Sequence, residues 1–486
     1  MSKSGYVSEL TRQSEDFPGW YNDVVLKAQL ASYSPVRGCM IIRPYGFAIW
    51  ESMRDELDRH IKATGHDNVY FPLFVPKSLL DREAHHVEGF DPQVAWVTRA
   101  GGDELEEPLA IRPTSEAIIA EAVKDWIQSY RDLPLLMNSW NNVVRWEMRT
   151  RLFLRTAEFL WQEAHTFHAS EAEAAEEVAT GLAAYVAVSE DWLAIPVIQG
   201  RKSPAETFPG ANYTHAIEAM MRDRKALQAG TSHMLGQNFA RAADITFLDR
   251  NNERVHPYGT SWGFSTRMVG ATVMAHGDDS GLVLPPNVAP TQVVVVPIFR
   301  SEEDRVSVAA AIERLQAALA DVRTVSGPLR LKVDWREETP GYKYNHWELR
   351  GVPFRLEIGP RDVAAEQAML VRRLDRAKEA LPLASLTDEL PRRLQAYQAE
   401  LFERARDFRA QNTHHVDSLG EMTEVLDASG GFVLAPWCGA AECERAVSAE
   451  NGATIRVIPF DSPDEPGACV VDGAASARRV LFARAY

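Results

Sequence analysis

The sequence is poor in cysteine and has no long hydrophobic run. Its 486 residues include Cys39 and a C-terminal group of three cysteines, too few and too unevenly placed for a disulfide framework. No stretch of about 18 apolar residues occurs, which argues against a membrane-spanning helix. The N-terminal string MSKSGYVSEL lacks the basic and apolar regions of a secretion signal. We therefore expect a cytoplasmic protein without membrane association.

The common phosphate-binding fingerprints are also absent. Neither GxGxxG after a predicted strand nor GxxxxGK[ST] occurs, so a bound nucleotide would be held by side chains rather than by a glycine-rich loop. Positive charge is in deficit, because 52 Lys and Arg residues against 68 Asp and Glu residues give a formal charge of −16. This balance argues against nonspecific nucleic-acid binding, but it allows a local basic surface for a particular polynucleotide.

The length predicts two or three domains, and the pattern divides the chain into residues 1–287, 288–395 and 396–486. In the first unit, long helices such as 43–65 alternate with strand pairs of period two, which favours an antiparallel sheet surrounded by helices. The second unit alternates strands (292–298, 329–335, 353–359) with helices (307–322, 342–351, 365–381), typical of a small α/β domain. A long helix at 392–416 leads into the third unit.

A polar cluster, Arg112-Pro113-Thr114-Ser115-Glu116, interrupts two apolar runs. Thr114 or Ser115 is suited to cap the helix predicted at 116–127, and Glu116 in its first turn suits the positive end of the helix dipole. Arg112 gains nothing from that dipole. The cluster therefore has both a structural and a functional interpretation.

A predicted strand pair at 142–148 and 156–168 encloses a short basic loop. Alternation in a strand places Arg145, Glu147 and Arg149 on one face. On the returning strand, one face carries Trp161, Glu163, His165 and Phe167. Guanidinium groups opposite aromatic and acidic side chains suit a nucleoside triphosphate, with charge for phosphate and a flat surface for a base. A cross-strand ladder of salt bridges on a solvated sheet explains the pattern equally well.

Two further stretches combine glycine with polar residues. Gly259 and Gly263 interrupt a predicted strand, and Arg267 falls in the first turn of the following helix, where its charge opposes the dipole unless an anion shares the position. Arg267 reaching out to solvent is the alternative. Upstream, Gln228, Thr231, Ser232 and His233 surround a glycine in a string that is also typical of a polar turn or helix cap.

Together these stretches resemble the three signature motifs of class II aminoacyl-tRNA synthetases, specifically prolyl-tRNA synthetases of the archaeal and eukaryotic type. GHDNVYFPLFVP, with Gly65, Val69 and Pro72, is similar to motif 1, which in the family builds the homodimer interface. VVRWE and RLFLRTAEFLWQEAHTF are similar to motif 2, and GTSWGFSTRMVGATVMAHG to motif 3. The resemblance covers essentially the whole chain. It implies an α+β catalytic domain with an antiparallel sheet, an α/β anticodon-binding domain and a small C-terminal α/β zinc-binding-like domain.

The resemblance also implies the reaction and its residues. A proline–tRNA ligase activates proline with ATP and Mg²⁺ to prolyl-adenylate and transfers it to the 3′ end of tRNA(Pro). Arg145 and Arg267 are the expected catalytic residues. The residues expected to bind proline are Thr114, Glu116, Arg145, Trp161, Glu163, His165, Phe167, Thr231 and His233. Those expected to bind ATP are Arg145, Glu147, Arg155, Thr156, Gln228, Thr231, Ser265 and Arg267.

The same resemblance assigns residues outside the catalytic unit. Glu348 and Arg355 match positions expected to contact anticodon guanines, for which ordinary surface charges are the alternative. Relatives often carry CxxxxC and CxxC near the C-terminus, but here the second pair is CVVD. The resulting set of Cys438, Cys443, Cys469 and Asp472 is compatible with structural zinc and with a metal-free unit. Tyr486 matches a terminal tyrosine whose carboxylate folds back toward the catalytic domain.

The sequence leaves one alternative within the enzyme class and one outside it. A threonyl synthetase shares the fold but grips its substrate through a zinc ion, and this candidate pocket offers no cysteine. A catalytically inactive synthetase-like module that binds tRNA or regulates a partner usually lacks a motif arginine, whereas Arg145, Arg155 and Arg267 are all present. The segment between His168 and Gly259 is too short for the editing domain of bacterial-type prolyl synthetases.

Overall fold

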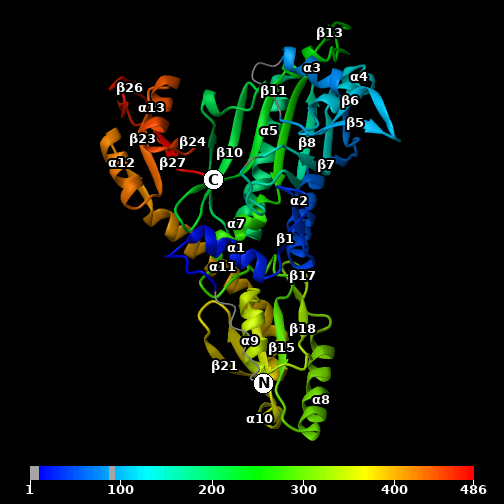
Figure 1. Cartoon of the computed structure of the whole chain (residues 1–486), viewed down its shortest axis with the longest axis vertical. Coiled ribbons are helices and arrows are strands. Elements are labelled where there is room, and N and C mark those ends of the chain that lie inside the picture. The colour runs from blue at the N-terminus through cyan, green and yellow to red at the C-terminus, as the bar shows by residue number, and fades with distance from the viewer. Residues whose placement is uncertain (1–9, 87–92, 148) are drawn as a thin grey trace.

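The computed structural model describes residues 10–86, 93–147 and 149–486. Figure 1 shows an elongated molecule in which the second predicted unit forms one end and the C-terminal unit lies beside the catalytic unit. None of the helices in the described ranges is long and apolar enough to cross a membrane.

An eleven-stranded sheet forms the centre of the fold. Its strands are β3 (Asp67–Asn68), β7 (Leu135–Val144), β8 (Glu158–His168), β9 (Val197–Arg201), β10 (Tyr213–Met220), β11 (Ala226–Gly236), β14 (Tyr258–Ser265), β22 (Thr413–His415), β23 (Phe432–Pro436), β24 (Thr454–Pro459) and β27 (Arg479–Ala483). Their order is β22-β23-β27-β24-β9-β10-β11-β14-β8-β7-β3. Neighbours are antiparallel except in the outer pairs β22–β23 and β3–β7. The antiparallel sheet expected for the catalytic unit is therefore confirmed.

The sheet continues from the catalytic unit into the C-terminal unit, a connection that the sequence did not predict. Strand β9 pairs with β24 through Arg201 with Ile458 and Gly200 with Pro459. A Cβ atom on Gly200 would lie 2.4 Å from the carbonyl oxygen of Ile458, so only glycine permits this approach. The two units therefore share one hydrogen-bonded framework.

Helices cover the catalytic part of this sheet. They are α1 (Phe17–Lys27), α2 (Pro44–Ala63), α3 (Lys77–His86), α4 (Glu116–Trp126), α5 (Glu171–Ala187), α6 (Asn238–Ala242) and α7 (Arg267–His276). The helix predicted at 43–65 is confirmed as α2. Helix α5 begins at a capping box formed by Ser170 and Glu173, and Gly181 lets it approach β14, because a Cβ there would meet the Trp262 ring at 2.4 Å.

Shorter strands complete the catalytic unit. They are β1 (Ala31–Tyr33), β2 (Met40–Ile42), β4 (Phe74–Pro76), β5 (Trp96–Ala100), β6 (Asp103–Ile111), β12 (Phe247–Leu248) and β13 (Arg254–Val255). Strands β4, β6 and β5 form a separate three-stranded antiparallel sheet. The pairs β1–β2 and β12–β13 are hairpin-like additions.

The second unit is a five-stranded sheet in the order β18-β15-β19-β20-β21 with helices packed on it. Its elements are β15 (Val293–Pro297), α8 (Glu302–Leu319), β16 (Arg323–Thr324), β17 (Gly327–Pro328), β18 (Leu331–Val333), α9 (Pro340–Leu349), β19 (Phe354–Ile358), α10 (Pro360–Ala364), β20 (Gln367–Arg372) and β21 (Lys378–Pro382). The helix predicted at 365–381 is wrong, because this segment is the β20–β21 hairpin. Its Ala, Leu, Arg and Lys residues favour a helix intrinsically, but pairing with β19 outweighs that preference.

The C-terminal unit contains α12 (Leu419–Ala428), α13 (Ala441–Asn451), β25 (Gly467–Ala468) and β26 (Ala475–Ser476) besides its share of the large sheet. The long helix predicted at 392–416 is α11 (Leu386–Gln411), which begins earlier and ends earlier. Leu386, Leu390 and Leu394 on this helix pack into the core of the second unit. Helix α11 thus passes across residue 396, the expected boundary of the third unit.

Two local predictions near the candidate site also need correction. The strand predicted at 142–148 ends at Val144, so Arg145 and Glu147 follow the strand, and residue 148 lies outside the described residues. The string containing Gly230, Thr231 and His233 is the middle of strand β11 rather than a turn or a cap. Gly230 is needed there because a Cβ would lie 2.7 Å from the Tyr185 ring.

Candidate functional site

Two cavities meet at Arg145, which lines both of them. The smaller has a volume of about 190 Å³ and lies over strands β8, β10, β11 and β14. Its lining residues are Thr114, Glu116, Arg145, Trp161, Glu163, Lys202, Glu206, Phe208, Thr214, Gln228, Thr231, His233, Ser261, Trp262 and Gly263. The larger has a volume of about 580 Å³, and its lining residues are Arg145, Glu147, Arg149, Thr150, Arg151, Phe153, Leu154, Arg155, Thr156, Phe159, Lys225, Ser265, Arg267, Ala485 and Tyr486.

The polar cluster before α4 faces strand β8 instead of capping its own helix. Ser115 occupies the N-cap position but makes no capping hydrogen bond with its side chain. Its hydroxyl donates to Glu163 Oε2 at 2.6 Å, and Thr114 Oγ1 donates to Glu116 and to Glu163 Oε1. The expected capping role of these hydroxyls is therefore wrong. Arg112 is buried and donates to the carbonyl oxygens of Phe71 and Asn142, which explains its place ahead of the cluster.

Two buried carboxylates in the smaller cavity have opposite electrostatic surroundings. Burial alone would raise the pKa of Glu163, but His165 and the hydroxyl and amide of Ser115 lower it to about 2. Burial raises the pKa of Glu116, although His165 partly opposes the rise. Glu163 is thus ionised and already satisfied, whereas His165 and Thr114 offset only part of the effect of burial on Glu116. A cationic ligand beside Glu116 would favour its ionised form.

Glu116, Glu163 and His165 also place three potential metal-ligand atoms within 4.8 Å of one another. Both oxygens of Glu163 are already used, since Oε1 accepts from Ser115 and His165 and Oε2 accepts from Ser115 and Asn141. This saturation leaves the group better suited to an ammonium than to a metal ion.

Arg145 is held rigidly between the two cavities. Its Nε donates to the carbonyl oxygen of Pro113 at 3.0 Å, and its guanidinium lies 5.6 Å from the Phe159 ring centre and 5.4 Å from that of Trp161. Burial lowers the pKa of Arg145, and Glu116 and Glu163 oppose that shift. A fixed cation at this point can neutralise anionic groups in either cavity.

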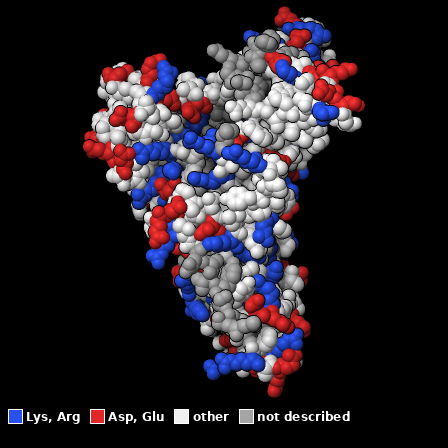
Figure 2. All heavy atoms as spheres, in the orientation of Figure 1, with Lys and Arg blue, Asp and Glu red and all other residues white. Residues whose placement is uncertain are grey.

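The larger cavity is strongly basic. Arg155 pairs with Glu147 at 2.8 Å, and Thr156 donates to the carbonyl oxygen of Glu158 at 2.7 Å. Arg267 begins α7 as predicted, and its Nε donates to the carbonyl oxygen of Leu154 at 3.1 Å. Ser265 accepts the backbone N–H of Arg267. Figure 2 shows Lys and Arg side chains gathered near the place where Figure 1 marks the C-terminus, which lines this cavity.

Strand β11 supplies His233, Thr231 and Gln228 to the smaller cavity. His233 Nδ1 lies 2.8 Å from Thr214 Oγ1, and its ring lies 4.7 Å from that of Phe208. Burial lowers the pKa of His233 to about 3, with His165 and Arg145 adding to the shift. The imidazole is therefore neutral near neutral pH. Gln228 and Thr231, expected to contact ATP, line the smaller cavity rather than the larger one.

Two of the expected proline-binding residues lie behind the cavity wall. His165 does not line the smaller cavity but contacts Glu163 at 2.8 Å. Phe167 packs with Phe71 and Ile119 in a separate hydrophobic cluster. Both residues share the strand face that alternation predicted, but α4 and its cluster cover that end of β8.

Sequence reasoning missed a segment that closes the smaller cavity. Lys202, Glu206 and Phe208 come from the connection between β9 and β10 and line it together. The string RKSPAETFPG has no periodicity or motif that would have indicated this role. The cavity is also lined by Ser261, Trp262 and Gly263, which lie in the motif 3 string a few residues before Arg267.

The predicted anticodon residues lie together in the second unit. Glu348 and Arg355 both line a cavity of about 120 Å³. Arg355 pairs with Glu357 at 2.8 Å and stacks 4.0 Å above the centre of the Tyr344 ring. Glu348 forms an ion pair with Arg376. An acidic and a basic side chain therefore face the same space.

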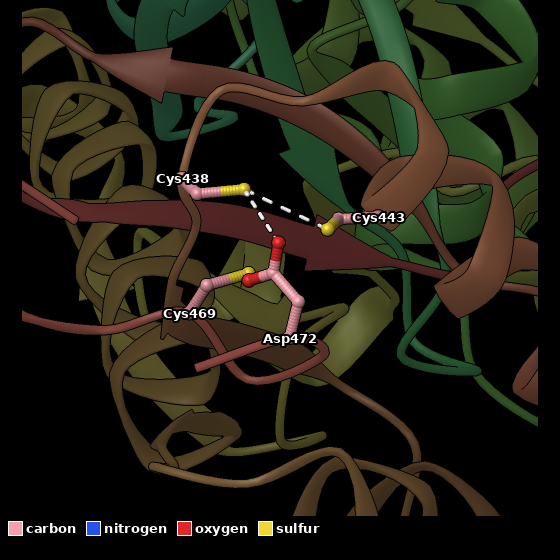
Figure 3. A group of neighbouring side chains, drawn as sticks. All are labelled: Cys438, Cys443, Cys469 and Asp472. Carbon is pink, nitrogen blue, oxygen red and sulfur yellow. Dashed lines mark hydrogen bonds between the residues drawn. The ribbon is translucent and has the colours of Figure 1, made fainter. Parts of the chain in front are cut away.

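The four candidate metal ligands converge in the C-terminal unit. Figure 3 shows Cys438, Cys443, Cys469 and Asp472 pointing toward one another. Cys438 Sγ lies 3.6 Å from Cys443 Sγ and 3.7 Å from Asp472 Oδ2, and all four ligand atoms lie within 4.8 Å of one another. The cysteines are free thiols. Three thiols and a carboxylate at these separations fit a tetrahedral zinc ion.

Comparisons with known proteins agree with the fold. Residues 96–276 match the class II core domain of tRNA synthetases for G, H, P, S and T, and residues 292–393 match an anticodon-binding domain. These matches define a class II aminoacyl-tRNA synthetase. Residues 419–486 match the C-terminal domain of prolyl-tRNA synthetases.

Full-length relatives identify the particular family. The chain is 51% identical to a proline–tRNA ligase of Natranaerobius thermophilus, with 100% of each chain covered. It is 53% identical to one from Chloroflexus aurantiacus, covering 98% of this chain and 99% of the relative. A crystal structure of Cryptosporidium parvum prolyl-tRNA synthetase with halofuginone and AMPPNP superimposes with a TM-score of 0.92 at 38% identity, covering 98% and 99%. The chain belongs to the prolyl-tRNA synthetase family.

Proposed function

We propose that the two cavities joined at Arg145 hold proline and ATP side by side and that this chain joins proline to tRNA(Pro). The ligase activity follows from membership of the family, and the observation that supports the assignment of the cavities is the shared guanidinium of Arg145. A cation common to both sites is what a reaction between a carboxylate and a phosphate requires.

The smaller cavity fits proline. Its volume of about 190 Å³ suits a small amino acid. The secondary ammonium of proline lies against Thr114 and Glu116, and the carboxylate of proline faces Arg145. Burial raises the pKa of Glu116, and the ammonium lowers it again by favouring the ionised form. The Trp161 ring, Thr231 and His233 enclose the pyrrolidine. Glu163 lines the cavity as well, while His165 and Phe167 support its walls from behind.

The larger cavity fits ATP. Arg155 and Arg267 face the phosphates, while Thr156, Ser265 and Glu147 complete the lining. Gln228, also expected to contact ATP, lines the smaller cavity. Mg²⁺ would neutralise phosphate charge when bound, and Glu147 is the one acidic side chain among the described residues that line this cavity. The remaining ligands of such an ion would be phosphate oxygens and water.

The reaction needs no nucleophile from the protein. The proline carboxylate oxygen attacks the α-phosphorus, the bond to the bridging oxygen of pyrophosphate breaks, and pyrophosphate leaves with that electron pair. Arg145 and Arg267 oppose the charge that gathers on the phosphate oxygens. The terminal ribose hydroxyl of tRNA then attacks the prolyl carbonyl carbon. AMP leaves, and the hydroxyl proton passes to the released phosphate or to solvent.

The second unit binds the anticodon of tRNA(Pro) through Glu348 and Arg355. A guanidinium pairs with the acceptor edge of guanine, and a carboxylate accepts from its amino group. Both side chains line one cavity whose other walls include Trp347, Arg372 and Lys378. This arrangement supplies base-edge contacts together with positive charge for the phosphates.

The C-terminal cluster binds structural zinc through Cys438, Cys443, Cys469 and Asp472. The support is the fit of three thiols and one carboxylate to a tetrahedral ion. Cys438 lies in the loop between β23 and α13 and Cys443 lies in the first turn of α13, while Cys469 and Asp472 belong to the turn between β25 and β26. A metal ion there joins two otherwise separate segments.

The chain functions as a cytoplasmic homodimer. Three large side chains along and beside the motif 1 segment are unusually exposed for a single copy: Tyr70 at 75%, Phe74 at 44% and Trp96 at 43%. Figure 2 shows a broad surface without charged side chains where Figure 1 places β7 and β8. A second copy of the chain covers this surface, since an isologous dimer buries the same patch on both subunits.

The test of this function is ATP–pyrophosphate exchange on untagged protein with proline, cysteine, alanine and threonine compared side by side. Strong exchange with proline and weaker exchange with cysteine and alanine are expected, because a compact apolar slot discriminates by size only modestly. Exchange driven best by threonine would favour the threonyl alternative. Absence of exchange with all four would favour an inactive tRNA-binding or regulatory module.

A further inference from the structure

A buried ionic triad joins the catalytic and C-terminal units next to the smaller cavity. Lys202 Nζ lies 3.0 Å from Glu218 Oε1, and Arg456 contacts both oxygens of Glu218 at 3.1 and 3.2 Å. Lys202 follows β9 and Glu218 lies on β10, whereas Arg456 comes from β24 of the C-terminal unit. All three side chains are almost completely buried.

A second polar contact crosses the same junction. Ser203 donates to Glu444 Oε1 at 2.8 Å, and both residues are buried. Glu444 lies on α13, directly after the candidate metal ligand Cys443. Two elements of the C-terminal unit therefore hold Lys202 and Ser203, which are consecutive residues of the catalytic unit.

These two residues begin the segment that closes the smaller cavity. Lys202 itself lines the cavity, followed by Glu206 and Phe208. Phe208 is fixed at the other end, because its backbone N–H donates to Thr214 Oγ1 at 3.0 Å and its ring packs on His233. The position of the segment thus depends on anchors at both of its ends, and the first anchor lies in another unit.

The charges of the triad explain why the anchor needs Arg456. Burial alone would raise the pKa of Glu218, but Lys202 and Arg456 together hold it below its ordinary range. One carboxylate balances two cations, so each cation restrains the other through the shared Glu218. Without Arg456, Lys202 would be the one remaining cation of the triad on Glu218, and its ammonium would be free to shift toward the positions that Arg456 now occupies.

We propose that Arg456, acting through Glu218, is a positioning residue for the proline site, and that the C-terminal unit thereby sets the affinity of the catalytic unit for its amino acid. Arg456 lines neither cavity, and its contact with the proline site runs through Glu218 to Lys202 and the segment that follows it. This inference rests on the proposed binding of proline in the smaller cavity.

The test compares Arg456→Ala, Arg456→Lys and Arg479→Ala in steady-state ATP–pyrophosphate exchange on the full-length protein. Arg479 is the matched control, because it pairs with Asp417 and Glu465 inside the C-terminal unit and lines neither cavity. For Arg456→Ala we expect the KM for proline to rise about tenfold while the KM for ATP and kcat stay within about twofold of wild type. Arg456→Lys should recover most of the loss, and Arg479→Ala should leave the KM for proline unchanged.

Three outcomes would overturn the inference. The first is a folded Arg456→Ala variant with the wild-type KM for proline. The second is an equal change in both KM values and kcat that Arg479→Ala reproduces, which would indicate general loss of structure. If Arg456→Ala does not fold, Ser203→Ala takes its place, because it removes only the neighbouring anchor to Glu444. The third outcome that would overturn the inference is an unchanged KM for proline in that variant. Wild-type protein without proline-dependent exchange would instead refute the proposed function itself.

Discussion

Ser115 donates two hydrogen bonds to the carboxylate of Glu163, from its backbone N–H to Oε1 at 2.8 Å and from its hydroxyl to Oε2 at 2.6 Å. The contact joins the start of α4 to the middle of β8 across 48 residues of sequence. It fixes an ionised carboxylate in the floor of the smaller cavity and leaves Glu116 as the carboxyl that responds to a ligand.

Replacing Ser115 by alanine should therefore affect both stability and proline binding. Loss of one hydrogen bond to a buried charge is expected to lower the free energy of unfolding by about 1.5–3 kcal/mol. The KM for proline should rise several-fold, since Glu163 loses a partner beside the ligand. Ser170→Ala is the control, because it removes a helix cap of α5 and should cost about 1 kcal/mol without changing the KM for proline. Urea unfolding and exchange kinetics measure the two effects, and equal kinetic changes in both variants would contradict the assignment.

Arg145→Ala should abolish proline-dependent exchange while leaving the protein folded. The guanidinium lines both cavities and opposes charge on the reacting groups, so its loss should reduce kcat by about a hundredfold or more. Arg145→Lys should recover only part of the activity, because an ammonium does not reproduce the planar contact with Trp161. Near-wild-type exchange by the alanine variant, with circular dichroism unchanged, would rule out the shared-cation arrangement.

The site was predictable where a residue type conflicts with its local structural role. Arg267 opposes the dipole of α7, and that conflict pointed to an anionic ligand. Arg112 conflicts with its position in the same way, but backbone carbonyl oxygens hold its side chain, and Glu116 was assigned through the family resemblance alone. Lys202 gave no such signal, because its position depends on strand β24, which lies more than 250 residues later in the sequence. Alternation correctly placed Trp161 and Phe167 on one face of β8, but only tertiary packing decides that Phe167 lies under α4.

The same distinction applies to the fold. Period-two and helical patterns located α2, β8, β15 and α7 from local sequence alone. The hairpin at 367–382 was missed because its residues favour a helix until β19 pairs with β20. The continuous sheet across Gly200 and Pro459 could not be predicted, since nothing local marks the edges of two strands as partners.

Stability should fall as the pH drops from about 7 toward 4. Burial lowers the pKa of His66, His168, His215, His276 and His346 to about 4 and that of His233 to about 3. Below pH 6.5, the ordinary pKa of histidine, these side chains bind protons in the unfolded chain but not in the folded chain. Each such histidine contributes about 1.4 kcal/mol per pH unit to the slope of the free energy of unfolding against pH. Their contribution to stability is thus present above pH 6.5 and is lost on acidification.

A single substitution tests this linkage. His276→Gln removes one buried imidazole, which contacts the carbonyl oxygen of Leu193 at 2.8 Å, while its amide can keep that hydrogen bond. The pH dependence of the urea midpoint between pH 7 and 5 should become shallower by about one proton relative to wild type. An unchanged dependence would mean that His276 is protonated in the folded protein.

Removal of metal should destabilise the C-terminal unit. Chelation or Asp472→Ala is expected to lower metal content from about one zinc per chain. Either change should also reduce the thermal midpoint, because the two segments that supply the ligands lose the ion that joins them. Asp472→Cys should retain zinc more tightly, since it creates four thiolate ligands. Asp461→Ala, an exposed acid in the same unit, is the control. Wild-type protein without bound zinc after growth in zinc-supplemented medium would favour the metal-free alternative.

Glu348→Ala should impair aminoacylation of tRNA(Pro) and leave ATP–pyrophosphate exchange intact. Loss of one base contact is expected to lower kcat/KM for tRNA by about tenfold, whereas the catalytic cavities lie in another unit. Glu379→Ala is a matched control, because Glu379 also pairs with an arginine of the second unit, at 2.8 Å from Arg393, but does not line the anticodon cavity. With a tRNA in which one anticodon guanine is replaced, the kcat/KM values of wild type and Glu348→Ala should differ less. Equal losses in the two assays, or equal effects of the two substitutions, would show that Glu348 supports the fold rather than the recognition of tRNA.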